Sequence, residues 1–237
     1  MRRNDHLIFG TCDTKDFGVG IYGDQLANAP QRSVDVMSVP GKNGDVIIDN
    51  GRYENITVSY KAYIIDEYNQ NIRGLRSALL SQHGYQKLED SVNPEEYRMG
   101  CILPFNIEEY GILRAGEFTL QFNCKPQRYI KEGDYAITFT SNGSIHSDYD
   151  EDAKPLIRAY GTGSFTINGV QITINSASSY TDFDCELMEA YKDTMATNCN
   201  GNITLNNGKF PVLSKGNNAV TFSGLSSLEI KPRWWII

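Results

Sequence analysis

Apolar and polar residues alternate along several stretches of the first half of the chain. The pattern is clearest over residues 56–64, where every second residue is apolar and most of the residues between are polar. Strict alternation is typical of a β-strand with one buried face, because successive side chains point to opposite sides. We therefore expect strands at residues 33–39, 46–48, 56–64, 99–103 and 117–123, with turns at 41–45 and at Asn50-Gly51.

The apolar period changes once in this half of the chain. Tyr68, Ile72, Leu75 and Leu79 follow one another at intervals of four, three and four residues. This spacing places all of them on one face of a helix, and Gly84 is suitably placed to end it. One helix is therefore expected within a β-rich N-terminal half.

The second half carries the signals of an all-β structure. Asn168-Gly169, the strongest two-residue signal for a β-hairpin, separates the apolar runs at residues 165–167 and 170–174. Asn142-Gly143 and Asn207-Gly208 lie between further short apolar runs. Strands with turns about every 8–12 residues are typical of a β-sandwich.

A domain boundary is expected where the two patterns meet, between Lys125-Pro126 and Gly133-Asp134. Residues 1–130 should then form an N-terminal β-sheet or β-sandwich domain with one inserted α-helix, and residues 131–237 a C-terminal β-sandwich. The fold class is mainly β. The content of 14 Tyr and 10 Phe agrees with this class, because aromatic rings pack well on pleated surfaces.

Charge and composition exclude several classes of protein. A formal net charge of −7 with no basic run argues against a nucleic-acid partner, because binding phosphates requires a surplus of Lys and Arg on one face. Met1-Arg2-Arg3 is not followed by the apolar stretch of a secretory signal, and no apolar run approaches the ~20 residues that span a bilayer. We expect no membrane insertion.

The cysteines indicate the compartment in which the chain folds. They are odd in number, widely scattered and contain no CxxC pair, as in proteins that fold in a reducing cytoplasm. Their thiols are expected to be small buried groups. They are Cys12, Cys101, Cys124, Cys185 and Cys199.

Two short patterns imitate ligand-binding motifs. Residues 18–23 fit G-x-G-x-x-G, but the dinucleotide motif needs an apolar strand before it and a helix after it, and polar residues 13–16 and Pro30 exclude both. We expect a glycine-rich loop there. Residues 147–152 begin like a calcium loop but lack the Gly and Glu that an EF-hand requires at its sixth and twelfth positions, so a solvated acidic loop is expected, with a weak surface cation site left open.

No catalytic set or cofactor motif emerges from the sequence. The three histidines, His6, His83 and His146, have no second ligand at metal-binding spacing, so we expect no metal and no cofactor. The pairs Glu95-Glu96 and Glu108-Glu109 could supply a glycosidase acid and base, but adjacent carboxylates are usually a charged surface turn. The chain is therefore expected not to be an enzyme.

Trp234 and Trp235 form the one candidate contact site in the sequence. Exposed aromatic rings can stack on a sugar or anchor a protein contact. The interpretation favoured at these positions is a final strand that packs into the sandwich or against a neighbouring subunit.

Several segments of the chain resemble the distal tail protein (Dit) family of long-tailed (siphovirus) phages or prophages of Gram-positive bacteria. They include a glycine-rich signature before a long strand, the end of the helix, a domain-closing strand and two segments of the C-terminal half. Their order and spacing over residues 30–235 carry the resemblance, more clearly than the first thirty residues do. The segments are residues 39–45, 49–55, 79–91 with Pro94 and Tyr97-Arg98, 118–122, 124–129, 182–191 and 210–218.

The resemblance implies a structural protein of the virion. Residues 1–130 would be the ring-forming (belt) domain and residues 131–237 a galectin-like sandwich. The ring, usually a homo-hexamer, would join the tail tube protein to the tail-tip protein and the receptor-binding apparatus at the tip of the tail. The protein would fold in the cytoplasm of the bacterial host and act without nucleic acid.

Two other function classes are kept as hypotheses. One is a carbohydrate-binding module that contacts the host cell wall, with Trp234 or Trp235 as a stacking platform. Enlarged members of the resembled family carry carbohydrate-binding insertions, for which 237 residues leave no room. The other is a hydrolase of wall polymers, motivated only by the carboxylate pairs.

Overall fold

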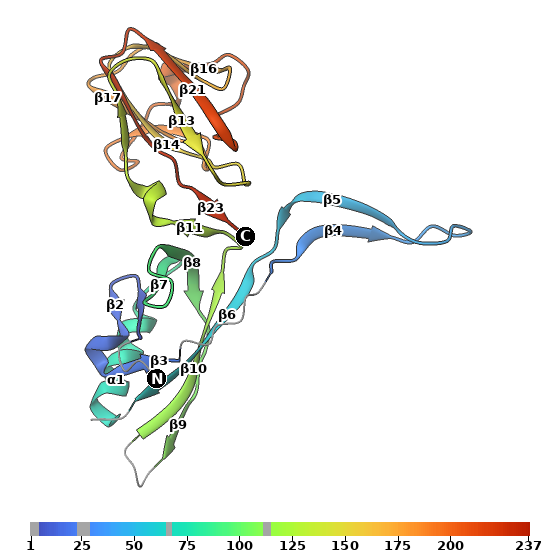
Figure 1. Ribbon diagram of the computed structural model, residues 1–237, viewed down its shortest axis with the longest axis vertical. Helices are drawn as coiled ribbons and strands as arrows, with labels where there is room; N and C mark the ends of the chain where they lie inside the picture. Colours follow the sequence, from blue (N-terminus) through green and yellow to red (C-terminus); the bar gives the residue numbers. More distant parts are fainter. Residues whose placement is uncertain (1–4, 23–28, 65–67, 111–114) are drawn as a thin grey trace. The chain divides into compact units, whose positions relative to one another are not determined.

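The computed structural model describes residues 5–22, 29–64, 68–110 and 115–237. The chain divides into two compact units, Met1–Arg128 with Ile237 and Tyr129–Ile236, here called unit 1 and unit 2. Figure 1 shows the elements of each. Within the described ranges the fold is mainly β with one α-helix, which confirms the expected fold class.

Unit 1 contains an antiparallel sheet, whose strand order differs from the order along the chain, and a separate strand pair. The sheet order is β2-β1-β7-β8-β10-β6-β3, with β9 also paired to β10, while β4 pairs with β5. The elements are β1 (Leu7–Phe9), β2 (Cys12–Asp13), a 3₁₀ turn η1 (Thr14–Phe17), β3 (Val19–Ile21), β4 (Arg32–Met37), β5 (Val46–Tyr53), β6 (Ile56–Ile64), α1 (Tyr68–Leu80), β7 (Gln86–Asp90), β8 (Glu96–Ile102), β9 (Ile107–Tyr110) and β10 (Ala115–Cys124).

The core of unit 1 lies on one face of this sheet. Strands β6 and β10 pair antiparallel over nine residue pairs, from Gly116↔Ile64 to Cys124↔Ile56. Their inward side chains join one hydrophobic cluster with Leu75 and Leu79 of α1, both fully buried. The alternation over residues 56–64 thus reflects one face against the core and one face outward, as predicted.

The expected strands and the helix of the first half are confirmed, but two local details differ. No turn forms at Asn50-Gly51: β5 continues to Tyr53, Gly51 has φ 70°, and the register shift between Arg32 and Val34 places the extra residues of a bulge on β5, at residues 50–52. The helix ends at Leu80, before Gly84, which has φ 69° in the connection to β7.

Residues 18–21 form a turn and a strand, so the expected glycine-rich loop is wrong there. Gly18 ends η1 in the left-handed region, at φ 64°, and β3 follows at once. At Gly20 a Cβ would lie 2.6 Å from the ring of Tyr63, so the glycine is needed for close packing of β3 against β6. Gly23 of the motif lies outside the described residues.

Unit 2 is a β-sandwich. Its sheets have the orders β12-β22-β14-β17-β18-β19 and β13-β21-β15-β16-β20, and β11 pairs with β23. The elements are β11 (Arg128–Ile130), η2 (Lys131–Asp134), β12 (Ile137–Phe139), β13 (Gly143–Ser147), β14 (Leu156–Tyr160), β15 (Gly163–Ile167), β16 (Val170–Ile174), β17 (Tyr180–Asp184), β18 (Glu189–Lys192), β19 (Thr197–Asn198), η3 (Asn200–Asn202), β20 (Ile203–Leu205), β21 (Gly216–Ser223), β22 (Ser227–Lys231) and β23 (Trp235–Ile236).

The two sheets bury one shared core, and the predicted hairpin forms. Phe165 of one sheet and Phe183 of the other are fully buried, with ring centroids 5.2 Å apart in an edge-to-face arrangement. Asn168 and Gly169, at φ 50° and 79°, make the two-residue turn between β15 and β16. By contrast, Asn142 ends the connection from β12 to β13, and Gly143 is the first residue of β13; these two strands belong to different sheets.

Two ion pairs lie on the outward face of the first sheet of unit 2. Arg158 donates to both carboxylate oxygens of Asp182, at 2.6 and 2.8 Å. Arg233 does the same to Asp184, at 3.0 and 2.9 Å, and the backbone N–H groups of Glu186 and Leu187 donate to Oδ1 of this carboxylate. Asp184 therefore connects the β17–β18 turn to the chain that enters β23.

The ionised carboxylate of Asp184 is expected to stabilise unit 2, and this stabilisation should be lost in acid. Burial acts to raise the pKa of Asp184, but the hydrogen bonds and charge of Arg233 together with the two N–H groups lower it overall. A group whose pKa is depressed in the folded state contributes stability above its unfolded pKa, and this contribution is lost as the pH falls through the folded pKa. The loss should appear below a pH of about 4.

We predict that Asp184→Asn destabilises unit 2 by about 2–4 kcal/mol at neutral pH and weakens the loss of stability below pH 4. Urea titrations followed by Trp fluorescence measure this, because both Trp residues lie in unit 2. Asp152→Asn, at an exposed position of the same unit, is the matched control. Equal unfolding midpoints for the two variants would contradict the role given to Asp184.

Candidate interaction surface

Strands β4 and β5 form a two-stranded ribbon, which we call the arm (residues 32–53). Within the described residues these strands hydrogen-bond only to each other. The register places Val36 opposite Ile47 and Met37 opposite Val46. Since directly opposite residues share a face, Val36 and Ile47 lie on one face of the arm, while Met37 and Val46 lie on the other.

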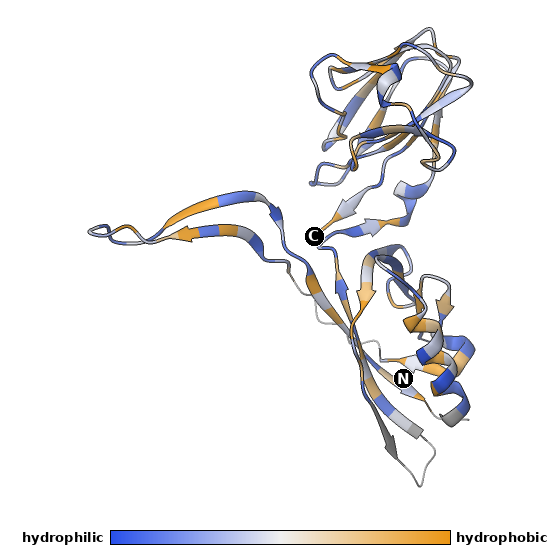
Figure 2. Ribbon diagram, turned by 180° about the vertical axis from the view of Figure 1, so that it is seen from behind, coloured by the Kyte–Doolittle hydropathy of each residue, from blue (hydrophilic) through white to orange (hydrophobic). Residues whose placement is uncertain are grey.

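Both faces of the arm are apolar and exposed. The exposed fractions are 61% for Val36 and 67% for Ile47 on one face, and 56% for Met37 and 48% for Ile48 on the other. Figure 2 shows these segments of β4 and β5 as hydrophobic stretches. A two-stranded ribbon is marginally stable alone in water, and exposed apolar patches mark interaction sites. The arm therefore has the character of a surface that a partner covers.

The base and the tip of the arm are ordered by local contacts. Nε of Arg32 donates to Asp49 at 2.6 Å, and Nη1 of Arg32 donates to the hydroxyl of Tyr53 at 3.0 Å. The hydrogen bond to Asp49 raises the pKa of Arg32, and the same bond lowers the pKa of Asp49. At the tip, Gly41 and Gly44 adopt φ 80°, which permits the reversal of the chain.

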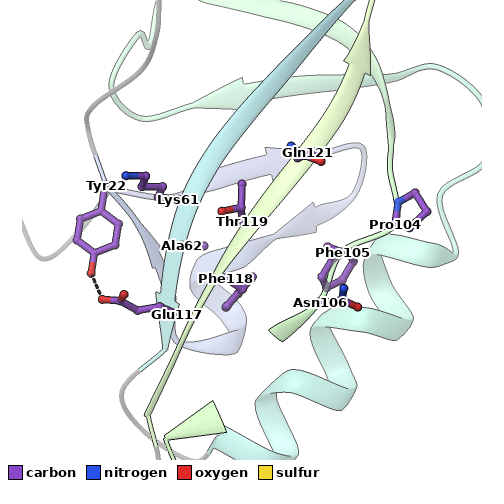
Figure 3. Close-up of a pocket in the computed structure, with 10 residues that line it drawn as sticks. All are labelled: Tyr22, Lys61, Ala62, Pro104, Phe105, Asn106, Glu117, Phe118, Thr119 and Gln121. Atoms are coloured by element: carbon purple, nitrogen blue, oxygen red, sulfur yellow. Dashed lines mark hydrogen bonds between the residues drawn. The ribbon is translucent and has the colours of Figure 1, made fainter. Parts of the chain in front are cut away.

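A trough of about 530 Å³ lies on the outward face of β3, β6 and β10 in unit 1 (Figure 3). Lys61 and Thr119 are opposite each other in the register, and with Glu117 and Gln121 they belong to the exposed rows of β6 and β10. The trough is lined by Tyr22, Lys61, Ala62, Pro104, Phe105, Asn106, Glu117, Phe118, Thr119 and Gln121.

The aromatic residues of the trough are held in place by neighbours. The hydroxyl of Tyr22 donates to Oε1 of Glu117 at 2.7 Å, and its ring lies 5.0 Å from that of Tyr63. Phe105 stacks on Phe118, with centroids 6.4 Å apart. The trough thus combines aromatic side chains with a polar floor that bears one cation, Lys61, and one anion, Glu117.

The Trp residues singled out in the sequence differ in their surroundings. Trp234 is 5% exposed, belongs to the core cluster of unit 2 and has the ring of Tyr149 5.9 Å away. It is therefore a core residue and offers no surface for a sugar. Trp235 is half-buried in β23, and its Nε1 donates to the carbonyl oxygen of Asp152 at 3.1 Å.

The other sequence candidates do not converge on one site. Glu96 forms an ion pair with Arg128, and Glu95 is exposed. The side chains of Glu108 and Glu109 lie outside the described residues. In the described ranges no group of three or more His, Cys, Asp or Glu side chains could hold a metal ion, and none of the helices is long and apolar enough to cross a membrane.

The acidic loop and the cysteines are two further features singled out in the sequence. His146 contacts Asp148 at 3.2 Å and Asn217 at 2.8 Å on an exposed surface. All five cysteines are free thiols. Burial raises the pKa of Cys12 to about 11 and that of Cys124 to about 12, and it also raises the pKa of Cys185. Protonated thiols of this kind are unreactive.

Solved structures of phage tail proteins share this fold. The crystal structure of the SPP1 Dit protein (gp 19.1), described as a paradigm of the hub adsorption apparatus in phages that infect Gram-positive bacteria, matches with a TM-score of 0.69 at 13% identity, over 96% of this chain and 98% of that one. The phage P2 baseplate in its activated conformation, with Ca and with Sr, matches with a TM-score of 0.54 at 13% identity, over 96% of this chain and 97% of that one.

The likeness at this level of identity concerns the fold, and there it confirms the expected resemblance across both units. No family model matches the chain, and no curated protein matches it. The fold comparison is thus independent of detectable sequence similarity.

We predict that the two Trp residues respond differently to truncation. Trp234→Ala should destabilise unit 2 by about 3–5 kcal/mol, because it leaves a cavity in the core. Trp235→Ala should cost clearly less, because its ring is already partly in water. Urea unfolding followed by circular dichroism compares them, and an equal or larger effect of Trp235→Ala would contradict this assignment.

Proposed function

We propose that the chain is a structural component of a phage tail, a distal tail protein whose copies form a ring between the tail tube and the tail-tip apparatus. The observation that carries this proposal is the likeness of fold to the SPP1 Dit protein over nearly the whole of both chains. A partial match would leave one unit unexplained. Here both units are covered, in a chain of nearly the same extent.

The arm supports ring formation through unit 1. A ring arises when one surface of each copy binds a different surface of the next copy and the rotation closes. At ~3.3 Å per residue, the eleven residues from Arg32 to the tip at Lys42 span roughly 30 Å. Such a length suffices to reach a neighbouring copy, whose contact would cover the exposed apolar side chains of the arm.

The remaining features agree with a role in assembly. Among the described side chains, Glu96 is paired with Arg128 and Glu95 is exposed, and burial raises the pKa of the Cys12, Cys124 and Cys185 thiols. A tail component needs specific contacts with itself and with neighbouring proteins, here the tail tube and tail-tip proteins and the receptor-binding apparatus. It would fold in the host cytoplasm and act at the tip of the virion tail.

The structure does not favour the carbohydrate-binding alternative. Trp234 lies in the core, so one half of the suggested stacking platform is absent from the surface. Tyr180, on the outward face of the first sheet, already has the guanidinium of Arg158 4.3 Å from its ring centroid and the ammonium of Lys192 5.3 Å from it. These cations occupy positions over the ring that a sugar would need.

Light scattering combined with negative-stain images of the purified chain tests the proposal. We expect closed rings of about six copies, alone or with the tail tube and tail-tip proteins. The double variant Val36→Ser/Ile47→Ser should remain folded, because both side chains are exposed, and should lose the ring. Substitutions at such exposed sites usually change stability by less than about 0.5 kcal/mol.

Leu187→Ser/Met195→Ser provides the matched control, because these apolar residues of unit 2 are 51% and 50% exposed. This control should assemble like the parent chain. Rings that survive in the arm variant would rule out the arm as the ring contact. Failure of the parent chain to form any ring, alone and with its tail partners, would overturn the proposed function itself.

A further inference from the structure

Unit 1 carries two surfaces that complement each other. One is the tip of the arm, residues 38–45, all of which are exposed. The other is the trough of β3, β6 and β10. Because the tip is exposed in the single chain, it does not fill the trough of its own copy. Resting on the proposed ring, we propose that the arm tip of each copy sits in the trough of the next copy.

The trough is large enough for the tip of the arm but too small for the whole two-stranded ribbon. Its volume of about 530 Å³ lies within the ~300–1,000 Å³ typical of pockets for drug-sized molecules. A few residues of a turn fit such a space, whereas the full two-stranded ribbon does not. At the tip the N–H of Lys42 donates to the carbonyl oxygen of Val39 at 3.1 Å, which keeps the turn compact and narrow.

Charge gives the contact its direction and register. The tip presents Lys42 and Asp45, and the floor of the trough presents Lys61 and Glu117. Lys61 and Glu117 are diagonal neighbours across β6 and β10, a relation that separates residues by about 7–8 Å. One cation and one anion on each surface can therefore pair as Asp45 with Lys61 and Lys42 with Glu117.

The apolar parts of the two surfaces match as well. Val39 and Pro40 are the first two residues of the turn, and both are exposed. The trough offers Pro104 and the rings of Tyr22 and Phe105. The hydroxyl of Tyr22 holds the carboxylate of Glu117, so this anion is positioned before a partner arrives. A pre-positioned charge lowers the cost of ordering on binding.

Charge reversal tests the contact in the full chain. Asp45→Lys alone places two cations together, and Lys61→Glu alone places two anions together. Each single variant should stay folded but need at least about a tenfold higher protein concentration to form rings, since like charges at an interface are strongly unfavourable. The double variant Asp45→Lys/Lys61→Glu restores opposite charges and should form rings again.

Mixing the two single variants is the sharper experiment. In an equimolar mixture, Lys at position 45 of one copy meets Glu at position 61 of the next, and the following contact is the native pair. Alternating rings should therefore form from two proteins that are each defective alone, which requires the contact to lie between copies. Light scattering and images of the mixture measure this.

Lys15→Glu and Asp148→Lys make the same changes of charge at exposed positions elsewhere and should leave the rings unaffected. Single variants that assemble normally, or defects that neither the mixture nor the double variant repairs, would overturn the pairing while leaving the proposed ring intact. A parent chain that forms no ring with or without its tail partners would overturn both.

Discussion

Unit 1 depends on the pairing of β6 with β10. This pair has the longest register in the sheet, and its inward side chains, among them Tyr60 and Leu120, meet α1 in the core. The same pair supplies the outward rows that form the floor of the trough, and β6 follows the arm after only two residues, Glu54 and Asn55. The trough is therefore built on this pair, and the arm is joined to the same pair by a connection of two residues.

Unit 2 is held by a different kind of constraint, the charge pairs on its outward face. Asp182 and Asp184 are nearly buried although they point away from the sandwich core, because Arg158 and Arg233 cover them. Arg233 adopts φ 57°, a conformation that side chains other than glycine seldom take. Its fork on Asp184 fixes the backbone there, and Trp234 next to it enters the core. The ion pair between Arg233 and Asp184 thus fixes the backbone conformation at Arg233, which the apolar core alone does not determine.

Sequence periodicity predicted most of the fold, because burial on one face forces alternation. The failures occur where another constraint overrides it. Asn50-Gly51 has the composition of a turn, but pairing with β4 on both sides, at Asp49 and at Tyr53, absorbs these residues into a bulge within β5. The exposure of the arm was not predicted, although the consecutive apolar residues Val46, Ile47 and Ile48 signalled a strand covered on both faces. A sequence cannot show that the covering surface is missing from its own chain.

The trough was beyond sequence reasoning for a related reason. Its residues come from four separate segments, and only the register of β6 and β10 brings Lys61 close to Glu117. If the arm of each copy binds this trough in the next, the angle between successive copies follows from the geometry of a single unit 1. A stiff sheet repeats that angle without accumulating error, whereas flexible connections would yield open or irregular assemblies. A constant angle therefore requires a short connection between the arm and the trough, and in this chain only Glu54 and Asn55 separate β5 of the arm from β6, which lines the trough.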